Sequence, residues 1–154
     1  MDIAKILKPE SVIPRLRATS KDEALRALAD IAAPVTGKDS RAILGVLQAR
    51  EALGTTGVGN GIALPHGRMP GLDRIHAFFA RLDQPVPFEA MDDQPVDLIF
   101  VLLVPADAGT EHLKALARIS RLLSDGRICE QIRKGGSADE LREILTRPTA
   151  TCAA

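Results

Sequence analysis

The chain has 154 residues, of which 45% are hydrophobic and 26% charged, and its formal net charge is zero. This length predicts one domain with its own hydrophobic core. The balanced charge argues against nucleic acid as a partner, and a chain with no Trp or Tyr and four Phe has few rings for stacking on bases.

The sequence also carries no sign of export or membrane insertion. Its two cysteines, Cys129 and Cys152, do not make a disulfide framework, and no Cys-x-x-Cys metal pattern occurs. The first residues lack the apolar run of a signal peptide, and no apolar stretch reaches the roughly 18 residues of a membrane span. We therefore expect a cytoplasmic protein without membrane insertion.

A helix is predicted to begin just after residue 20. Ser20 and Glu23 form a capping-box pattern, and the apolar residues within 24–32 follow at helical spacing. Pro34 and Gly37 are expected to end this helix. A second helix follows, capped by either Asp39 or Ser40 and running to the glycine-rich segment, with its inner face formed by Ile43, Leu44 and Leu47.

Three strands are predicted in the middle of the chain. Residues 62–64 are short and apolar, and residues 75–82 form a second candidate that ends in a turn at 83–85. Residues 96–104 are almost continuously apolar, which is typical of a strand covered on both faces.

The last third of the chain is predicted to be helical. Thr110 is expected to open a helix over residues 111–123 that Gly126 stops, and shorter helices are expected over 128–134 and 137–145. The inner face of the first of these helices is expected to contain Leu113, Leu116, Ile119 and Leu122 or Leu123.

Strands and helices occur together without internal repeats. This pattern predicts an α/β fold, in which helices cover both faces of a small β-sheet. We expect the domain to cover residues 1–148 and the residues 149–154 to form a loose tail.

The most informative segment is the glycine-rich run over residues 54–68, which contains Pro65-His66-Gly67. Its glycines allow the backbone to approach a small group closely. His66 can offer a neutral imidazole nitrogen as a nucleophile near neutral pH. By itself, the pattern fits a glycine-rich turn with a surface histidine as well as it fits a reactive site.

Residues 51–67 resemble the active-site signature of the type-2 enzyme IIA domains of the bacterial phosphoenolpyruvate-dependent phosphotransferase system. In that family an acidic or amide residue precedes a glycine-containing loop, which leads into an apolar-Ala-apolar-Pro-His-Gly segment. The matching residues are Glu51, Val58-Gly59, Ile62-Ala63-Leu64, Pro65, His66 and Gly67. The resemblance continues through 93–100 and 102–107 and covers roughly residues 7–145. Within the family, the chain is most similar to the nitrogen-regulatory branch, which implies a mixed sheet flanked by helices.

The resemblance implies that His66 is the phosphorylated nucleophile of a phosphocarrier. Its phosphoryl donor would be the phosphohistidine of an HPr-type carrier protein, with no cofactor and no metal ion. Such a transfer needs in-line placement and charge stabilisation more than covalent chemistry from the protein. The family also suggests phosphorylation at Nε2, which leaves Nδ1–H for a backbone carbonyl.

Two further residues match functional positions of the family. Arg50 corresponds to the arginine that precedes the loop, and a guanidinium presents paired donors to a phosphoryl group. His112 corresponds to a second histidine, which is expected to orient the phosphoryl group without carrying it.

Other residues are candidates for supporting roles. The hydroxyl groups of Thr55 and Thr56, and backbone N–H groups of the Gly57–Gly67 loop, including those of Gly59 and Gly67, could bind phosphoryl oxygens as an anion nest. Arg68 could help to dock an acidic or phosphorylated partner, or it could simply face solvent.

Two other polar residues are assigned to the fold. Glu51 is expected to cap loop amides or to pair with a basic residue. His76, in the predicted strand 75–82, has no counterpart in the family motif and is expected to be a surface or semi-buried histidine without a catalytic role.

Three functions remain open. The nitrogen-regulatory resemblance implies a signalling protein whose two phosphorylation states bind different partners, such as potassium transport components or sensor kinases. The alternative is a sugar-specific enzyme IIA of the fructose or mannitol kind, which would pass the phosphoryl group to a IIB domain during uptake. A remote alternative is a metal-dependent hydrolase that uses His66, His112 and Glu111.

Overall fold

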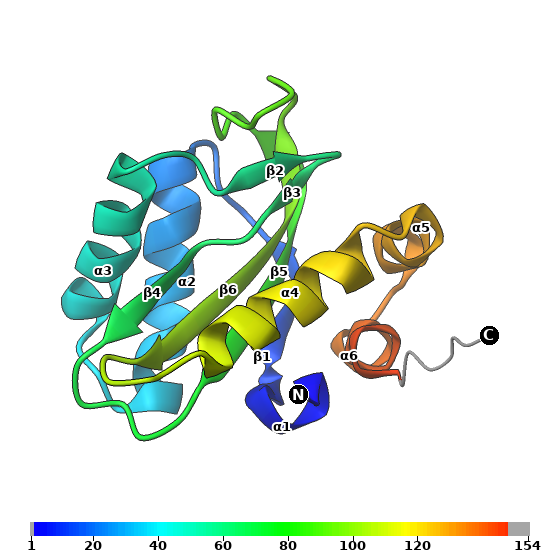
Figure 1. Ribbon diagram of the computed structural model, residues 1–154. Coiled ribbons are helices and arrows are strands. Elements are labelled where there is room, and N and C mark those ends of the chain that lie inside the picture. The colour runs from blue at the N-terminus through cyan, green and yellow to red at the C-terminus, as the bar shows by residue number, and fades with distance from the viewer. Residues whose placement is uncertain (1, 148–154) are drawn as a thin grey trace.

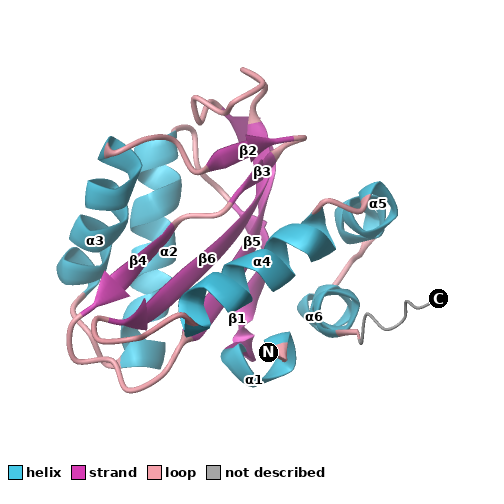
Figure 2. Cartoon of the chain, in the orientation of Figure 1, coloured by secondary structure: helices cyan, strands magenta, loops and turns pink. Residues whose placement is uncertain are grey.

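The computed structural model describes residues 2–147, so the predicted tail lies outside the described residues. Its strands are β1 Leu7–Leu16, β2 Gly57–Gly59, β3 Ile62–Ala63, β4 His66–Met69, β5 His76–Val86 and β6 Val96–Pro105. Its helices are α1 Ile3–Ile6, α2 Lys21–Thr36, α3 Ser40–Ala52, α4 Glu111–Leu123, α5 Gly126–Lys134 and α6 Ala138–Thr146. Figures 1 and 2 show these elements as one sheet between two groups of helices.

The strands form a single mixed sheet. Its order is β1-β5-β6-β3-β2, and β4 also pairs with β6. β6 is parallel to β3 and β4 and antiparallel to β5, while β1 is parallel to β5 and β2 antiparallel to β3. The predicted α/β class and the mixed sheet are therefore confirmed.

Helices cover both faces of this sheet, as predicted. α2 and α3 pack on one face, and the remaining helices lie on the other (Figure 1). β6 contributes alternate side chains to two cores: Leu98, Phe100 and Leu102 face α4, α5 and α6, while Ile99, Val101 and Leu103 face α2 and α3. Because both faces are covered, β6 reads in the sequence as a continuous apolar run.

The predicted ends of the first helix are partly correct. The Ser20 side chain accepts a hydrogen bond from the Glu23 N–H, as an N-cap does, but the Glu23 carboxylate binds Thr19 and not the Ser20 N–H. Pro34 does not end α2. The helix continues to Thr36 and closes at Gly37, which has a left-handed φ of 74°. Asp39, not Ser40, caps α3 through the Ala42 N–H.

The sheet differs from the prediction in the unpredicted strands β1, β2 and β4 and in the end of β5. β1 was not predicted, because Pro9 and Pro14 weaken its strand pattern. β1 is an edge strand, so it pairs with another strand on one side only. On its free side no N–H has to be donated to a neighbouring strand, and proline is tolerated there. β5 also does not turn at residues 83–85 but continues to Val86 after an irregularity in its pairing with β6.

The C-terminal helices require two corrections. Gly126 does not stop α4, which ends at Leu123, but is the first residue of α5. Leu113 does not face the core, because it is 56% exposed, and Ala115 takes the buried position in its place.

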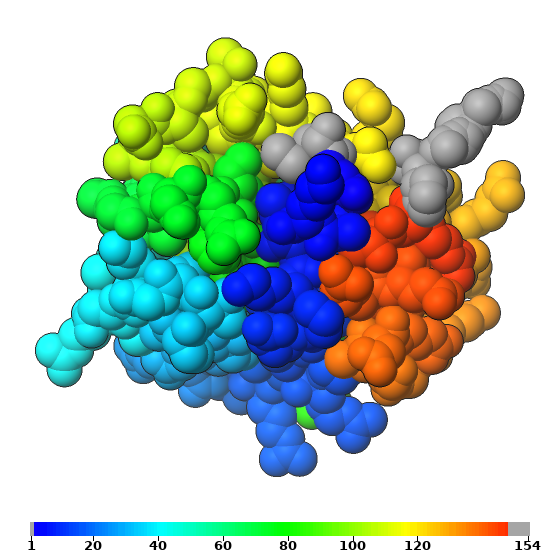
Figure 3. All heavy atoms as spheres, turned by 90° about the horizontal axis from the view of Figure 1, so that it is seen from below, coloured from blue at the N-terminus to red at the C-terminus, as the bar shows by residue number. Residues whose placement is uncertain are grey.

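The two ends of the described chain pack together. In Figure 3 the N-terminal segment, in blue, has the C-terminal helices, in orange and red, against one side of it. The Arg142 guanidinium of α6 donates hydrogen bonds to the carbonyl oxygens of Leu7 and Ala4, at 2.9 and 3.2 Å. In the described residues, no helix has the length and apolar character needed to cross a membrane.

Candidate functional site

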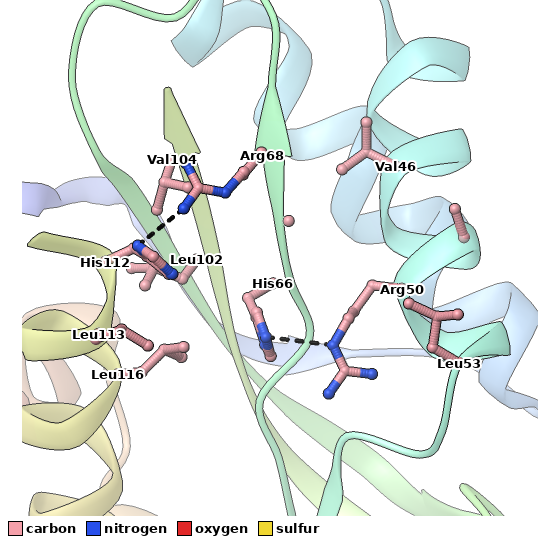
Figure 4. A pocket seen from close by; sticks show the side chains of 12 residues that line it. Val46, Arg50, Leu53, His66, Arg68, Leu102, Val104, His112, Leu113 and Leu116 are labelled. Atoms are coloured by element: carbon pink, nitrogen blue, oxygen red, sulfur yellow. Dashed lines mark hydrogen bonds between the residues drawn. The ribbon is translucent and has the colours of Figure 1, made fainter. Parts of the chain in front are cut away.

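A pocket of about 470 Å³ lies beside β4, between α3 and α4. Figure 4 shows the side chains that converge on it from these three elements and from β6. Arginine and histidine side chains supply its polar groups, and the rest of its wall is aliphatic. Its lining residues are Val46, Ala49, Arg50, Leu53, His66, Gly67, Arg68, Leu102, Val104, His112, Leu113 and Leu116.

A break in the sheet places His66 in this pocket. β3 pairs with Leu98 and Ile99 of β6, and β4 resumes the same parallel pairing at Leu102. Pro65 lies at the break and has no N–H to donate, while its carbonyl accepts the Leu102 N–H at 3.0 Å. His66 is the first residue after the break, so the sheet fixes its backbone.

The hydrogen bonds of His66 define its tautomer. Nδ1 lies 2.9 Å from the Leu64 carbonyl oxygen, which can only accept, so Nδ1 carries the proton. Nε2 therefore has the free lone pair, and it accepts a hydrogen bond of 3.3 Å from Nε of Arg50. This is the arrangement expected from the family: a neutral imidazole with Nδ1–H held by a backbone carbonyl.

The surroundings of His66 favour its neutral form. Burial lowers its pKa below the ordinary value of 6.5, and the positive charges of Arg50 and His112 lower it further. The hydrogen bond to Leu64 and the negative charge of Glu51 act in the opposite direction, but the net pKa is lowered. The imidazole is therefore neutral and nucleophilic near neutral pH.

Arg50 extends from the last turn of α3 toward His66 (Figure 4). Its Nη1 donates to the Gly54 carbonyl at 2.9 Å, which fixes the guanidinium beside the imidazole. The predicted neighbours Arg50 and His66 are thus brought together by the structure. Their proximity gives a charged, planar donor at the atom that would carry a phosphoryl group.

His112 and Arg68 approach the pocket from the opposite side. Nδ1 of His112 lies 3.0 Å from the Gly109 carbonyl oxygen. It also lies 3.5 Å from Nη2 of Arg68, a contact drawn in Figure 4. Since the carbonyl can only accept and the guanidinium can only donate, the shorter contact places the proton on Nδ1. Arg68 in turn donates to the carbonyls of Ala106 and Ala108, at 3.1 and 2.7 Å. Its side chain is therefore anchored to the segment before α4.

Three of the predicted phosphate-binding residues lie elsewhere. The Thr55 hydroxyl donates to the Phe88 carbonyl at 2.9 Å, and the Thr56 hydroxyl donates to Glu51 at 2.6 Å. Gly59 lies in β2 beside a different depression. None of the three lines the pocket of His66, so we do not include them in the proposed site.

The glycine-rich run is also more ordered than the predicted loop. From Gly57 to Gly67 the chain forms β2, β3 and the start of β4, and their pairing engages much of its backbone. We therefore do not retain the anion nest. Gly67 does line the pocket, and its role is steric, because a Cβ there would overlap the Val46 side chain of α3.

Of the two polar residues assigned to the fold, Glu51 behaves as expected, whereas His76 is buried and not at the surface or half-buried. Glu51 accepts hydrogen bonds from the Thr56 N–H and hydroxyl and pairs with Lys21 at 2.8 Å. His76 is 6% exposed and its ring stacks on that of Phe78. Burial lowers the pKa of His76 below 6.5, and nothing places it in the pocket.

Two exposed leucines at the pocket were not anticipated. Leu53, after α3, is 84% exposed, and Leu113, on α4, is 56% exposed. Leu113 was expected in the core because a leucine at helical spacing is typical of a core position, whereas no pattern in the sequence marks Leu53.

The residues needed for a metal-dependent hydrolase do not come together. Glu111 lines a separate depression with Asp73 and Arg74, whereas its neighbour His112 lines the pocket of His66. Within residues 2–147, no group of three His, Cys, Asp or Glu side chains is arranged to hold a metal ion.

Comparison with known proteins supports the resemblance noted in the sequence. The family described as "Phosphoenolpyruvate-dependent sugar phosphotransferase system, EIIA 2" matches residues 5–147. The nitrogen regulatory protein of Bradyrhizobium diazoefficiens is 50% identical over 153 residues, which cover 99% of this chain and 100% of that protein. The fructose-specific EIIA component of Haloferax volcanii is 34% identical over 94% of each chain.

A solved structure shows the same fold. Nitrogen regulatory protein IIA-Ntr from Neisseria meningitidis superposes with a TM-score of 0.90 at 36% identity, over 94% of this chain and 99% of that one. The predicted likeness to the nitrogen-regulatory branch is confirmed.

Proposed function

The chain belongs to the type-2 enzyme IIA family of the phosphoenolpyruvate-dependent phosphotransferase system, and on this premise we propose that Nε2 of His66 carries the phosphoryl group. The donor is the phosphohistidine of an HPr-type carrier protein. The Nε2 lone pair attacks phosphorus, the bond between phosphorus and the donor's ring nitrogen breaks, and that ring leaves with the bonding electrons.

The observation that carries this proposal is the set of hydrogen bonds on the His66 ring. Leu64 holds Nδ1–H, so the lone pair is on Nε2, and Arg50 lies at that same nitrogen. As the phosphoryl group arrives, the Arg50 guanidinium can move from the lone pair to the phosphoryl oxygens, where paired N–H donors stabilise the charge. Meanwhile the sheet holds the His66 backbone and the Leu64 carbonyl holds its ring, which is the positioning that phosphoryl transfer requires.

His112 is assigned an orienting role. It lies across the pocket from Arg50, and its Nδ1–H is held by Gly109. Its Nε2 is then the ring nitrogen left for the phosphoryl group, and it orients a phosphoryl oxygen by donating a hydrogen bond when the ring is doubly protonated. Gly67 supports the site by allowing β4 to pack closely on α3.

The phosphorylation state serves as a signal in this proposal. Its support is the extended likeness to nitrogen regulatory proteins, one of them 50% identical. A phosphoryl group at His66 places close to two negative charges between the exposed Leu53 and Leu113. Such a change can switch binding of regulated proteins, such as potassium transport components or sensor kinases.

A sugar-uptake role is the second candidate, supported by the 34% identity with a fructose-specific EIIA component. The two roles differ in the acceptor of the phosphoryl group. A sugar-specific protein would pass it to a IIB domain, whereas a regulatory protein would keep it while binding its targets.

The proposal is tested by mass spectrometry of the intact protein after incubation with phosphoenolpyruvate, enzyme I and an HPr-type carrier. We expect the mass of one phosphoryl group to be added, and lost again in acid because a phosphoramidate is acid-labile. His66→Ala should remain folded and gain no mass. Adding a fructose-type IIB domain then separates the two roles, since rapid loss of the label to IIB would favour sugar uptake.

A further inference from the structure

Lys21 and Glu51 form a largely buried ion pair behind the site. Nζ of Lys21 lies 2.8 Å from Oε2 of Glu51, and their side chains are 17% and 7% exposed. Lys21 is the first residue of α2 and Glu51 lies in the last turn of α3, so the pair joins two helix ends. The ammonium also lies 4.8 Å from the centre of the Phe88 ring.

Glu51 connects this pair to the turn that follows α3. One carboxylate oxygen accepts the Thr56 N–H at 2.8 Å and the other accepts the Thr56 hydroxyl at 2.6 Å. Burial by itself would raise the pKa of Glu51, but the hydrogen bonds from Lys21 and Thr56 lower it below 4.5 in net. The carboxylate is therefore ionised at neutral pH and fixes Thr56 by two charge-assisted bonds.

The turn between Glu51 and Thr56 also holds the Arg50 side chain. The Gly54 carbonyl lies within the turn between Glu51 and Thr56, and it accepts Nη1 of Arg50 at 2.9 Å. The same guanidinium donates Nε to His66 at 3.3 Å. A continuous series of contacts thus runs from Lys21 through Glu51, the turn and Arg50 to the reactive nitrogen.

We infer that Lys21 and Glu51 are positioning residues for phosphoryl transfer, which act on His66 through Arg50. Neither lines the pocket. Their charges fix the turn, the turn fixes the Gly54 carbonyl, and this carbonyl sets where the guanidinium lies. This inference rests on the proposed phosphorylation of His66, but it also makes a prediction that needs no phosphoryl donor.

Lys21→Met tests the inference, because it keeps an unbranched side chain of similar length and removes the ammonium with its contacts to Glu51, Glu89 and the Phe88 ring. We expect the rate of phosphorylation of His66 to fall roughly 10- to 100-fold, since a small misplacement of a catalytic group has this effect. We also expect the pKa of His66, followed by NMR, to rise toward 6.5, because the Arg50 charge that lowers it moves away. Lys21→Arg should restore much of both values.

Combining Lys21→Met with Arg50→Met shows whether Lys21 acts by positioning Arg50 or only by stabilising the fold. If Lys21 acts through Arg50, then Lys21→Met changes neither the rate nor the pKa further in the Arg50→Met background. Lys134→Met is the matched control, since it removes an ion pair with Glu130 in which the side chains are 76% and 66% exposed. This control should leave both values unchanged.

Two results would overturn the inference. One is a folded Lys21→Met protein with an unaltered rate and an unaltered His66 pKa. The other is an equal loss of rate in the wild-type and Arg50→Met backgrounds. A wild-type protein that accepts no phosphoryl group would refute the proposed function, and the NMR titration would still decide whether Lys21 positions Arg50.

Discussion

Nε of Arg50 donates a hydrogen bond to Nε2 of His66 over 3.3 Å. This bond occupies the lone pair that must attack phosphorus, so the resting geometry is not the reactive one. Because Nη1 stays bound to the Gly54 carbonyl, the guanidinium can release the lone pair without leaving the site. Arg50 thus both protects the neutral imidazole and remains within reach of the incoming phosphoryl group.

Replacing Arg50 should affect the rate of transfer and the pKa of His66 together. We expect Arg50→Met to slow phosphorylation by about 10²- to 10³-fold, the usual effect of losing a donor that stabilises developing charge. The pKa of His66 should rise, because Arg50 lowers it. Arg50→Lys should recover part of the rate, since a lysine keeps the charge but not the paired donors. The rate is measured by quenching the phosphorylation reaction at successive times and determining the labelled fraction. An Arg50→Met protein labelled as fast as wild type would contradict the assigned role.

Replacing His112 should slow the reaction without abolishing it. His112→Ala keeps Nε2 of His66 and Arg50 in place, so we expect the protein to be labelled about tenfold more slowly, which corresponds to about 1.4 kcal/mol in the barrier. The stoichiometry at completion, measured by intact mass, should still be one phosphoryl group. If His112→Ala abolished labelling while His66→Ala did not, the two histidines would have exchanged roles.

Gly67 should be intolerant of a side chain. A Cβ at this position would overlap Cγ1 of Val46, so Gly67→Ala forces β4 away from α3 and separates His66 from Arg50. We expect a loss of about 1–3 kcal/mol in the free energy of unfolding, together with slower phosphorylation. Val46→Ala removes the obstructing methyl group, so the double variant should recover in urea denaturation and in labelling. A double variant no better than Gly67→Ala would show that the contact is not the cause.

Two histidines should make the protein less stable in mild acid. The pKa values of His66 and His76 are both lowered by burial, so between these values and 6.5 the unfolded chain binds more protons than the folded one. The free energy of unfolding should therefore fall as the pH drops from about 7.5 to about 5.5. Carboxylates such as Glu51, whose ordinary pKa is 4.5, contribute to acid sensitivity at lower pH.

Urea denaturation at several pH values tests this expectation. His66→Gln and His76→Gln should each reduce the loss of stability over that range, because neither glutamine titrates. A wild-type protein equally stable at both ends of the range would contradict the origin proposed for the effect.

The sequence predicted the central parts of the fold well. The apolar run of β6 and the cap at Ser20 are local signals, and each is confirmed. β1 was missed because its tolerance of Pro9 and Pro14 depends on its place at the sheet edge, which local pattern does not reveal. Leu113 was assigned to the core for a similar reason, because periodicity does not show that the pocket interrupts the inner face of α4.

The sequence predicted the three central side chains of the site but not the residues that support them. His66, Arg50 and His112 were brought forward by the family resemblance, and the structure places all three around one pocket. Thr55 and Thr56 offer hydroxyl groups in the same glycine-rich segment as His66, but these hydroxyls donate to Phe88 and Glu51 and hold the turn after α3. The pair of Lys21 and Glu51 spans 30 residues of sequence, so only the tertiary structure could reveal it.

The central claim is that Nε2 of His66 bears the phosphoryl group. The most direct test is long-range ¹H–¹⁵N NMR of the histidine rings, recorded before and after phosphorylation by the carrier protein. We predict that before the reaction His66 is the tautomer with its proton on Nδ1, and that afterwards its Nε2 alone shows coupling to phosphorus. Coupling at Nδ1 of His66, or at either nitrogen of His112, would contradict the account.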